Sequence, residues 1–179
     1  MGCDIHSFAE VKRNNKWELV TDEIFPDWGG DKSNEPFSVR SYSVFAFLAG
    51  VRNYDHCEPI SECKGLPLDS EYLNKESGDW MGYKESVRKS IYEDCDYHSH
   101  SYLTLKELLN FDYTKTFWNR RVTKQTSPNS YNGASLAEEG EGEVISYKDN
   151  LGEGFFDTLN VLGTLGNPKN VRIIFWFDN

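Results

Sequence analysis

Apolar and polar side chains alternate near the start of the chain and predict a β-strand over residues 3–12. Small or apolar side chains share the face that we expect to point inward: Cys3, Ile5, Ser7, Ala9 and Val11. The opposite face carries Asp4, His6, Phe8, Glu10 and Lys12. Asn14-Asn15 follows as a turn, so residues 17–20 are predicted to return as the second strand of a hairpin.

A second strand signal lies at the other end of the chain. Residues 171–177 are apolar on both faces and rich in β-branched and aromatic side chains. A strand that is buried on both faces belongs in the interior of a sheet. We therefore predict a central strand, with Asp178 at its end.

Helical patterns occupy the sequence between these strands. Residues 42–50 are apolar on nearly every side and end at Gly50, which predicts a buried helix with a glycine C-cap. Thr104 and Glu107 form a capping box at the start of another helix. A polar helix over 83–93 and a last helix over about 152–164 complete the set.

These elements predict an α+β fold in one domain, residues 1–179. We expect a mixed or antiparallel sheet that contains both terminal strands and packs against two or three helices. The polar, glycine-rich stretch 125–143 is predicted to be a flexible loop. We expect that loop either to cover the ligand as a lid or to complete the pocket of a neighbouring subunit in a homo-oligomer.

The composition of the chain limits the kinds of molecule that we expect the protein to bind. The formal net charge of −10 argues against a protein that binds duplex nucleic acid, which normally presents a basic surface. No apolar run approaches the roughly 20 residues that span a bilayer, and the start of the chain lacks the zones of a signal peptide. The four cysteines form no Cys-x-x-Cys pair and are expected to be reduced. A cytoplasmic protein without a membrane partner is the resulting expectation.

Three of the four histidines lie in two short motifs, Asp4-Ile5-His6 and His98-Ser99-His100. In an extended strand, residues i and i+2 point to the same side, so their side chains can converge on one ion or one phosphate. One interpretation is a divalent metal site, with zinc or manganese held by Asp4, His6, His98 and His100. Such an ion could activate water for attack on a phosphoester.

A second interpretation uses the same region without a metal. Histidine and arginine side chains donate to phosphate, and a helix start offers backbone N–H groups to an anion. The ligand-binding residues would then be His6, Arg52, His98, His100, Ser101 and Thr104. An aromatic side chain such as Tyr102 or Trp118 could stack on a base. This pocket would take a small nucleotide-like molecule.

Several short stretches of the sequence resemble one family. They are the N-terminal Met1-Gly2-Cys3-Asp4-Ile5-His6, the helix exit Leu48-Ala49-Gly50-Val51-Arg52-Asn53, Gly65-Leu66-Pro67, the internal His98-Ser99-His100-Ser101-Tyr102-Leu103-Thr104-Leu105 and the C-terminal Phe175-Trp176-Phe177-Asp178-Asn179. The resemblance is to a largely uncharacterised family of small proteins of tailed bacteriophages and their bacterial hosts. It implies a phage protein in the bacterial cytoplasm, a setting in which small proteins often counter host defence.

Three functions follow from these observations. The first is binding of a small nucleotide-derived ligand, which would sequester a host defence signal. The second is a metal-dependent phosphoesterase or other hydrolase that uses the Asp/His cluster. The third is a protein that inhibits a host factor through its acidic surface. The sequence leaves open whether the protein is an enzyme.

Overall fold

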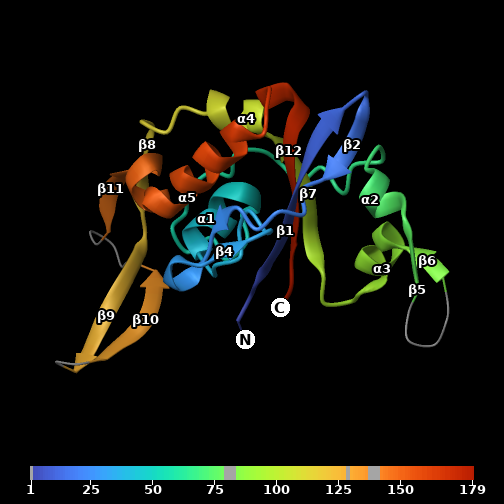
Figure 1. Cartoon of the computed structure of the whole chain (residues 1–179). Coiled ribbons are helices and arrows are strands. Elements are labelled where there is room, and N and C mark those ends of the chain that lie inside the picture. The colour runs from blue at the N-terminus through green and yellow to red at the C-terminus, as the bar shows by residue number, and fades with distance from the viewer. Residues whose placement is uncertain (1, 79–83, 128–129, 137–141) are drawn as a thin grey trace. The chain divides into compact units, whose positions relative to one another are not determined.

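The structure is a computed structural model that describes residues 2–78, 84–127, 130–136 and 142–179, without the side chains at 28, 122–127 and 130–136 (Figure 1). The chain divides into two compact units, which are described separately. Unit 1 comprises Met1–Arg40, Cys63–Asn110 and Phe156–Asn179. Unit 2 comprises Ser41–Glu62 and Phe111–Phe155. That both units belong to one domain stays a prediction.

A four-stranded antiparallel sheet forms the centre of unit 1. Its strands follow the order β2 (Lys16–Leu19), β1 (Ile5–Arg13), β12 (Val171–Phe177) and β7 (His98–Thr104). β1 and β12 pair from Ile5 opposite Phe177 to Val11 opposite Val171. Figure 1 shows these two terminal strands side by side. The predicted α+β class, with both terminal strands in one antiparallel sheet, is confirmed.

Local sequence explains the two strands that begin the chain. Asn14 and Asn15 both have positive φ angles, 49° and 62°, which suit the tight turn of a twisted hairpin and which asparagine tolerates. All seven residues of β12 are buried, so the apolar pattern correctly predicted a central strand. Trp17 of β2 and the rings of Phe175 and Phe177 of β12 are buried in unit 1.

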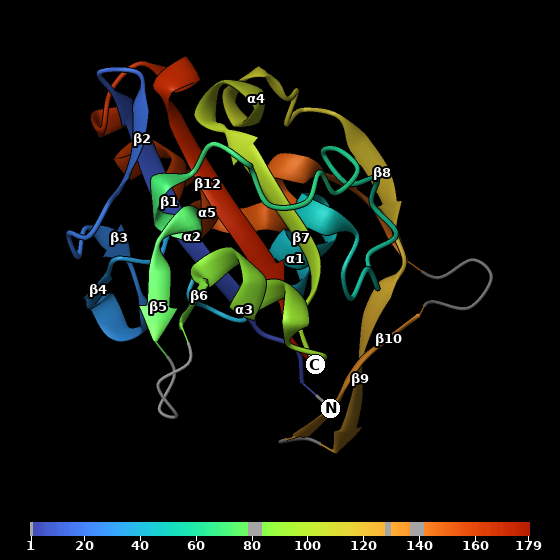
Figure 2. The same cartoon turned by 90° about the vertical axis from the view of Figure 1, so that its right-hand side faces the viewer.

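Smaller elements surround the sheet in unit 1. They are the short strands β3 (Phe25–Pro26), β4 (Lys32–Ser33), β5 (Glu76–Gly78) and β6 (Lys84–Ser86), the helices α2 (Glu71–Asn74), α3 (Val87–Glu93) and α4 (Leu105–Asn110), and the 3-10 turns η1 (Trp28–Gly30) and η2 (Pro168–Asn170). Figure 2 shows α2 and α3 over one face of the sheet. The predicted helix over 83–93 is shorter than expected, because residues 84–86 pair as a strand.

One expectation about β1 is wrong on the sheet face that lies under α2 and α3. The alternating pattern placed Phe8 and Glu10 on an outer face, but both side chains are buried. Phe8 joins a core cluster with Leu66, Leu73, Ile91, Ile174 and Trp176. Glu10 is buried because Arg172 pairs with its carboxylate, at 2.7 Å from Nη2 to Oε2. β1 is therefore covered on both faces.

Unit 2 is organised around helix α1 (Tyr42–Ala49). Gly50 closes this helix in the left-handed conformation, with φ of 69°, as the sequence predicted. The buried ring of Phe47 packs at 5.0–5.8 Å, centroid to centroid, against four aromatic rings, those of Phe111, Tyr113, Tyr147 and Phe155. Phe45 is also fully buried. The last helix, α5 (Tyr147–Thr164), belongs to unit 2 as far as Phe155 and to unit 1 beyond it. It begins earlier than predicted and is interrupted at Gly152.

The stretch that was predicted to be a loop contains paired strands. β9 (Arg121–Ser127) and β10 (Ser130–Leu136) form an antiparallel hairpin, and β11 (Glu143–Ser146) pairs with β8 (Thr116–Asn119). Most of the described residues of 125–143 are therefore in strands rather than in the expected loop. The remainder of the stretch, 128–129 and 137–141, lies outside the described residues, and flexibility stays a prediction.

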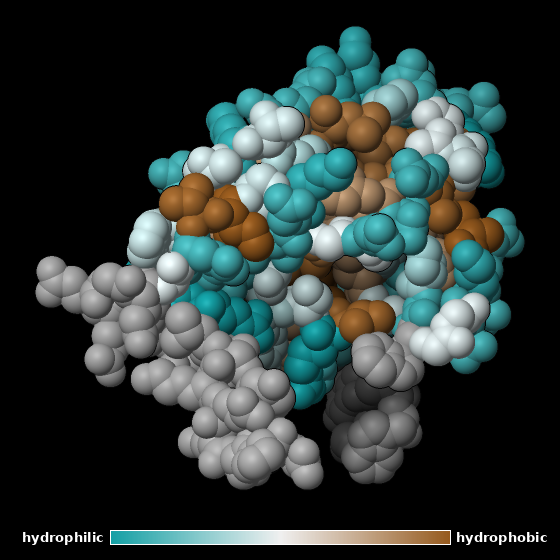
Figure 3. All heavy atoms as spheres, turned by 90° about the vertical axis from the view of Figure 1, so that its left-hand side faces the viewer, coloured by the Kyte–Doolittle hydropathy of each residue, from teal (hydrophilic) through white to brown (hydrophobic). Residues whose placement is uncertain are grey.

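Exposed apolar side chains are spread over several elements. Those that are large and more than a third exposed are Val39, Leu68, Tyr92, Leu109, Trp118 and Val144. On the face drawn in Figure 3, the brown apolar patches among the coloured residues are separated by hydrophilic ones. None of the helices in the described part of the chain is long and apolar enough to cross a membrane.

Candidate functional site

Asp4, the first predicted metal ligand, is held by an arginine. Arg40 donates from Nε to Oδ1 of Asp4 at 2.7 Å and from Nη2 to Oδ2 at 2.5 Å. This bidentate contact lowers the pKa of Asp4 below its usual value of 3.8. The Asp4 carboxylate is therefore already paired with the cationic side chain of Arg40.

His6 lies half-buried on β1 beside the end of β12. Its Nε2 is 3.1 Å from Oδ2 of Asp178, and the backbone N–H of Asp4 donates to the other oxygen, Oδ1, at 2.9 Å. The imidazole stacks on Trp176, with 5.4 Å between ring centroids and 12° between planes. Tyr97 contacts the imidazole at 5.0 Å. His6 is thus oriented by both a carboxylate and two aromatic rings.

His98 and His100 have different aromatic neighbours, and the strand is irregular between them. Ser99 between them has a positive φ of 53°, and the pairing of β7 with β12 is irregular at this point. The His98 ring lies near Phe177, at 6.1 Å, whereas the His100 ring lies near Tyr92, at 4.7 Å. Burial lowers the pKa of His100 below its usual value of 6.5. The Nε2 atoms of both histidines are buried without a hydrogen-bond partner in the described structure.

The four residues therefore do not form the expected metal cluster in this structure. Among the described residues, one group of three acidic or cysteine ligands has its ligand atoms within 4.8 Å of one another, Asp94, Cys95 and Asp96. All three of these residues are exposed. Exposed acidic side chains commonly lie this close without an ion, so this group does not replace the expected site.

The other predicted binding residues have structural roles in unit 1. Ser101 is buried, and its Oγ accepts the N–H of Lys64 at 3.1 Å. Thr104 forms the predicted capping box, because its Oγ1 accepts the N–H of Glu107 at 3.2 Å and its N–H donates to the Glu107 carboxylate at 2.8 Å. Arg52 belongs to unit 2, so its expected place beside the histidines stays a prediction.

A small pocket of about 190 Å3 opens beside His6. Its walls carry polar groups from His6, Asn34 and Glu35 and apolar or aromatic groups, among them Phe8, Tyr72 and Trp176. Burial raises the pKa of Glu35 above its usual value of 4.5, with a smaller upward effect from Asp27 and an opposing effect from His6. We refer to this cavity as the His6 pocket.

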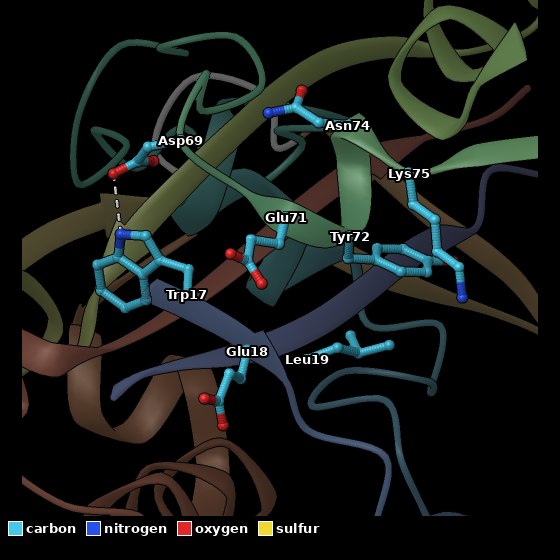
Figure 4. A pocket seen from close by; sticks show the side chains of 8 residues that line it. All are labelled: Trp17, Glu18, Leu19, Asp69, Glu71, Tyr72, Asn74 and Lys75. Carbon is cyan, nitrogen blue, oxygen red and sulfur yellow. Dashed lines mark hydrogen bonds between the residues drawn. The ribbon is translucent and has the colours of Figure 1, made fainter. Parts of the chain in front are cut away.

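A larger open groove adjoins the His6 pocket and shares Leu19 and Tyr72 with it. It has a volume of about 630 Å3 and is lined by β2 and α2 residues and their neighbours, Trp17, Glu18, Leu19, Asp69, Glu71, Tyr72, Asn74 and Lys75 (Figure 4). Asp69 accepts the indole N–H of Trp17 at 2.9 Å, as the dashed line in Figure 4 marks. We refer to this second cavity as the β2–α2 groove.

The sequence identified His6 but not most of its surroundings. Asp178 was expected at the end of a strand, where it could be a ligand or merely a polar terminus, and Glu35 lies in a stretch that carries no recognisable motif. The antiparallel pairing of His6 with Trp176 brings Asp178 close to the imidazole. The expectation that both terminal strands share a sheet was the signal that could have suggested the His6–Asp178 pair.

Comparison of the chain with protein-family models, with curated proteins and with solved structures finds no match. The candidate site is therefore argued from its own geometry.

Proposed function

We propose that the protein binds a small nucleotide-derived ligand and that the base of this ligand occupies the His6 pocket. The observation that carries the proposal is an imidazole fixed by Asp178 and Trp176 at the wall of a cavity that also contains Glu35. Preformed concave sites that combine aromatic walls with a few convergent polar groups are typical of small-molecule binding.

The tautomer of His6 follows from its partner. A carboxylate only accepts hydrogen bonds, so the Nε2 atom of His6 must donate to Asp178. In the neutral ring, Nδ1 then carries the lone pair and can accept an N–H of a ligand. Glu35, whose pKa is raised, donates when protonated, and the Asn34 amide both donates and accepts. The edge of a nucleobase offers matching donors and acceptors.

Size and charge favour the base rather than the phosphate inside the pocket. A volume of about 190 Å3 equals that of about six water molecules, at ~30 Å3 each, which suits one ring system. The carboxylate of Asp178, and that of Glu35 whenever it is ionised, would repel a phosphate at close range. Any phosphate of the ligand would therefore remain outside, in water.

The resemblance to phage proteins supplies a role for such binding. A protein that holds a nucleotide-derived signal removes it from solution without a chemical step, and a host defence signal is the proposed target. Sequestration requires only affinity and abundance. In the described structure the hydroxyl of Ser7, which follows His6 in the sequence, is buried and donates to the carbonyl of Phe37 at 3.0 Å, so the proposal assigns it no chemical step.

A second candidate function rests on the same His6–Asp178 pair. Histidines that bind metals commonly donate their second ring N–H to a carboxylate, which leaves one nitrogen for the ion. The second proposal is a hydrolase in which Nδ1 of His6 binds a divalent cation with help from Glu35. It predicts that zinc or manganese raises the melting temperature of the wild type but not that of a His6→Asn variant.

The first proposal is tested by thermal melting of the whole chain with nucleosides, cyclic nucleotides and ADP-ribose. A ligand at 100 times its Kd stabilises the native state by about 2.7 kcal/mol, which corresponds to a shift of roughly 5–11 °C for a protein of this size. The shift should be lost in Glu35→Ala and in His6→Asn.

His56→Asn serves as the matched control. His56 is exposed in unit 2 and has a positive φ of 60°, which asparagine also accepts. This variant should keep the full shift. The proposal fails if no compound on the panel stabilises the wild type, or if both the pocket variants and the control keep the shift.

A further inference from the structure

We propose that the β2–α2 groove binds an extended, basic peptide segment of a partner protein. This inference goes beyond the base-binding role of the His6 pocket, with which the groove shares Leu19 and Tyr72. It rests on an unused strand edge, on the charges along the groove and on the groove's aromatic walls.

The strand edge is found at Leu19. Val20 donates its N–H to the carbonyl of Ala9 at 2.9 Å, so Val20 faces β1 in the hairpin. The backbone N–H and C=O groups of successive residues point to opposite sides of a strand, so those of Leu19 point away from β1. Trp17 lies two residues earlier, and its backbone forms an isolated parallel β-bridge with Ser70 on this outward side. None of the backbone hydrogen bonds found in the described chain uses the outward side of Leu19.

An extended peptide can add to such an edge. In strand addition, the peptide backbone bonds to the open N–H and C=O groups while alternate side chains enter neighbouring pockets. Leu19 and Tyr72 are half-buried, pack on the core cluster and line the groove. The groove of about 630 Å3 is large enough for more than one side chain.

The charges along the groove select a basic peptide. Glu18 and Glu71 keep about half of their side chains exposed, 44% and 54%. In Figure 4 the Glu71 carboxylate lies between the rings of Trp17 and Tyr72. Each glutamate meets one exposed cation, Arg13 at 3.3 Å or Lys16 at 2.9 Å.

Those surface ion pairs contribute little, about 0–1 kcal/mol each, so an incoming cation can replace them. Asp22 and Glu23 follow β2 and are also exposed, which extends the acidic character beyond Leu19. Tyr72 offers a ring to an arginine or lysine side chain. The overall charge of −10 would speed the approach of a basic partner and repel an anionic one.

The test uses a labelled peptide, acetyl-Arg-Val-Arg-Val-Arg-amide, and fluorescence anisotropy with the whole chain. We expect saturable binding that weakens at least about tenfold in the double variant Glu18→Gln/Glu71→Gln, a loss of ~1.4 kcal/mol or more. The double variant Glu93→Gln/Glu153→Gln has the same net charge, and its altered residues are exposed and outside the groove. It should bind within about twofold of the wild type.

Two further peptides separate strand addition from general attraction between charges. A version with N-methylated valines cannot donate those backbone N–H groups and should bind at least about tenfold more weakly. A version with glutamate in place of arginine should not bind. Equal binding of the N-methylated peptide, equal weakening by both double variants, or no saturable binding of the arginine peptide would each overturn the proposal.

Discussion

The buried pair Glu10–Arg172 allows a quantitative prediction about stability. Arg172 donates from Nε to Oε2 of Glu10 at 2.9 Å, and Ser70 donates to Oε1 at 2.5 Å. The guanidinium also donates to Asp69 at 2.7 Å and lies 3.9 Å from the centre of the Trp17 ring. Glu10→Gln removes the negative charge while it preserves the shape of the side chain.

The magnitude follows from the burial of both partners. Glu10 is 0% exposed and Arg172 is 3% exposed, so the variant leaves a buried cation without its main counter-charge. Removing one partner of a buried pair costs about 3–5 kcal/mol. Because Asp69 still contacts the guanidinium, we expect the lower end, about 3 kcal/mol. That loss is a large share of a typical stability of ~5–15 kcal/mol.

Equilibrium unfolding in urea measures this loss directly. Glu10→Gln should shift the midpoint to lower urea without a change in slope. The double variant Glu10→Leu/Arg172→Met should recover most of the lost stability, because it leaves no buried charge behind. A loss below about 1 kcal/mol for Glu10→Gln would refute the reasoning, since such a value is typical of exposed pairs.

Three further predictions concern single residues. Thr104→Ala should reduce the free energy of unfolding by about 1 kcal/mol in urea titrations, because α4 loses its capping box, and Thr104→Ser should restore it. Gly50→Ala should cost ~1 kcal/mol in the same assay, because the residue has φ of 69°, and Gly50→Asn should cost less. The lowered pKa of His100 means that the folded state binds fewer protons than the unfolded state. The contribution of His100 to stability is therefore complete above pH 6.5 and is lost as the pH falls toward the folded pKa. Melting of wild type and His100→Phe between pH 5 and 8 should show this loss in the wild type alone, and parallel curves would contradict it.

Local sequence signals predicted the elements that depend on neighbouring residues. The Asn14-Asn15 turn, the Gly50 cap and the Thr104–Glu107 box each need only a few adjacent residues, and all three are confirmed. The sheet with both chain ends was inferred from the apolar pattern of residues 171–177. Such patterns reflect burial and backbone preference, which a single sequence displays directly.

Features that depend on distant partners were not predicted. Glu10 lies in an alternating strand where a carboxylate normally faces water, and its partner, Arg172, is 162 positions away. Ser99, between His98 and His100, has a positive φ, a conformation that serine rarely adopts and that no neighbouring residue signals. The irregular pairing of β7 with β12 at this point was therefore not predicted, although both histidines lie in a strand.

The most direct test of the central claim is to observe His6 itself. Nitrogen-15 NMR resolves the imidazole signals of the four histidines, and single variants assign them. Addition of adenosine, guanosine, cytidine or uridine should, for at least one nucleoside, move the His6 signals and leave those of His56 unchanged. If no nucleoside moves the His6 signals, or if the changes fall on His98 and His100 instead, the His6 pocket is not where the base binds.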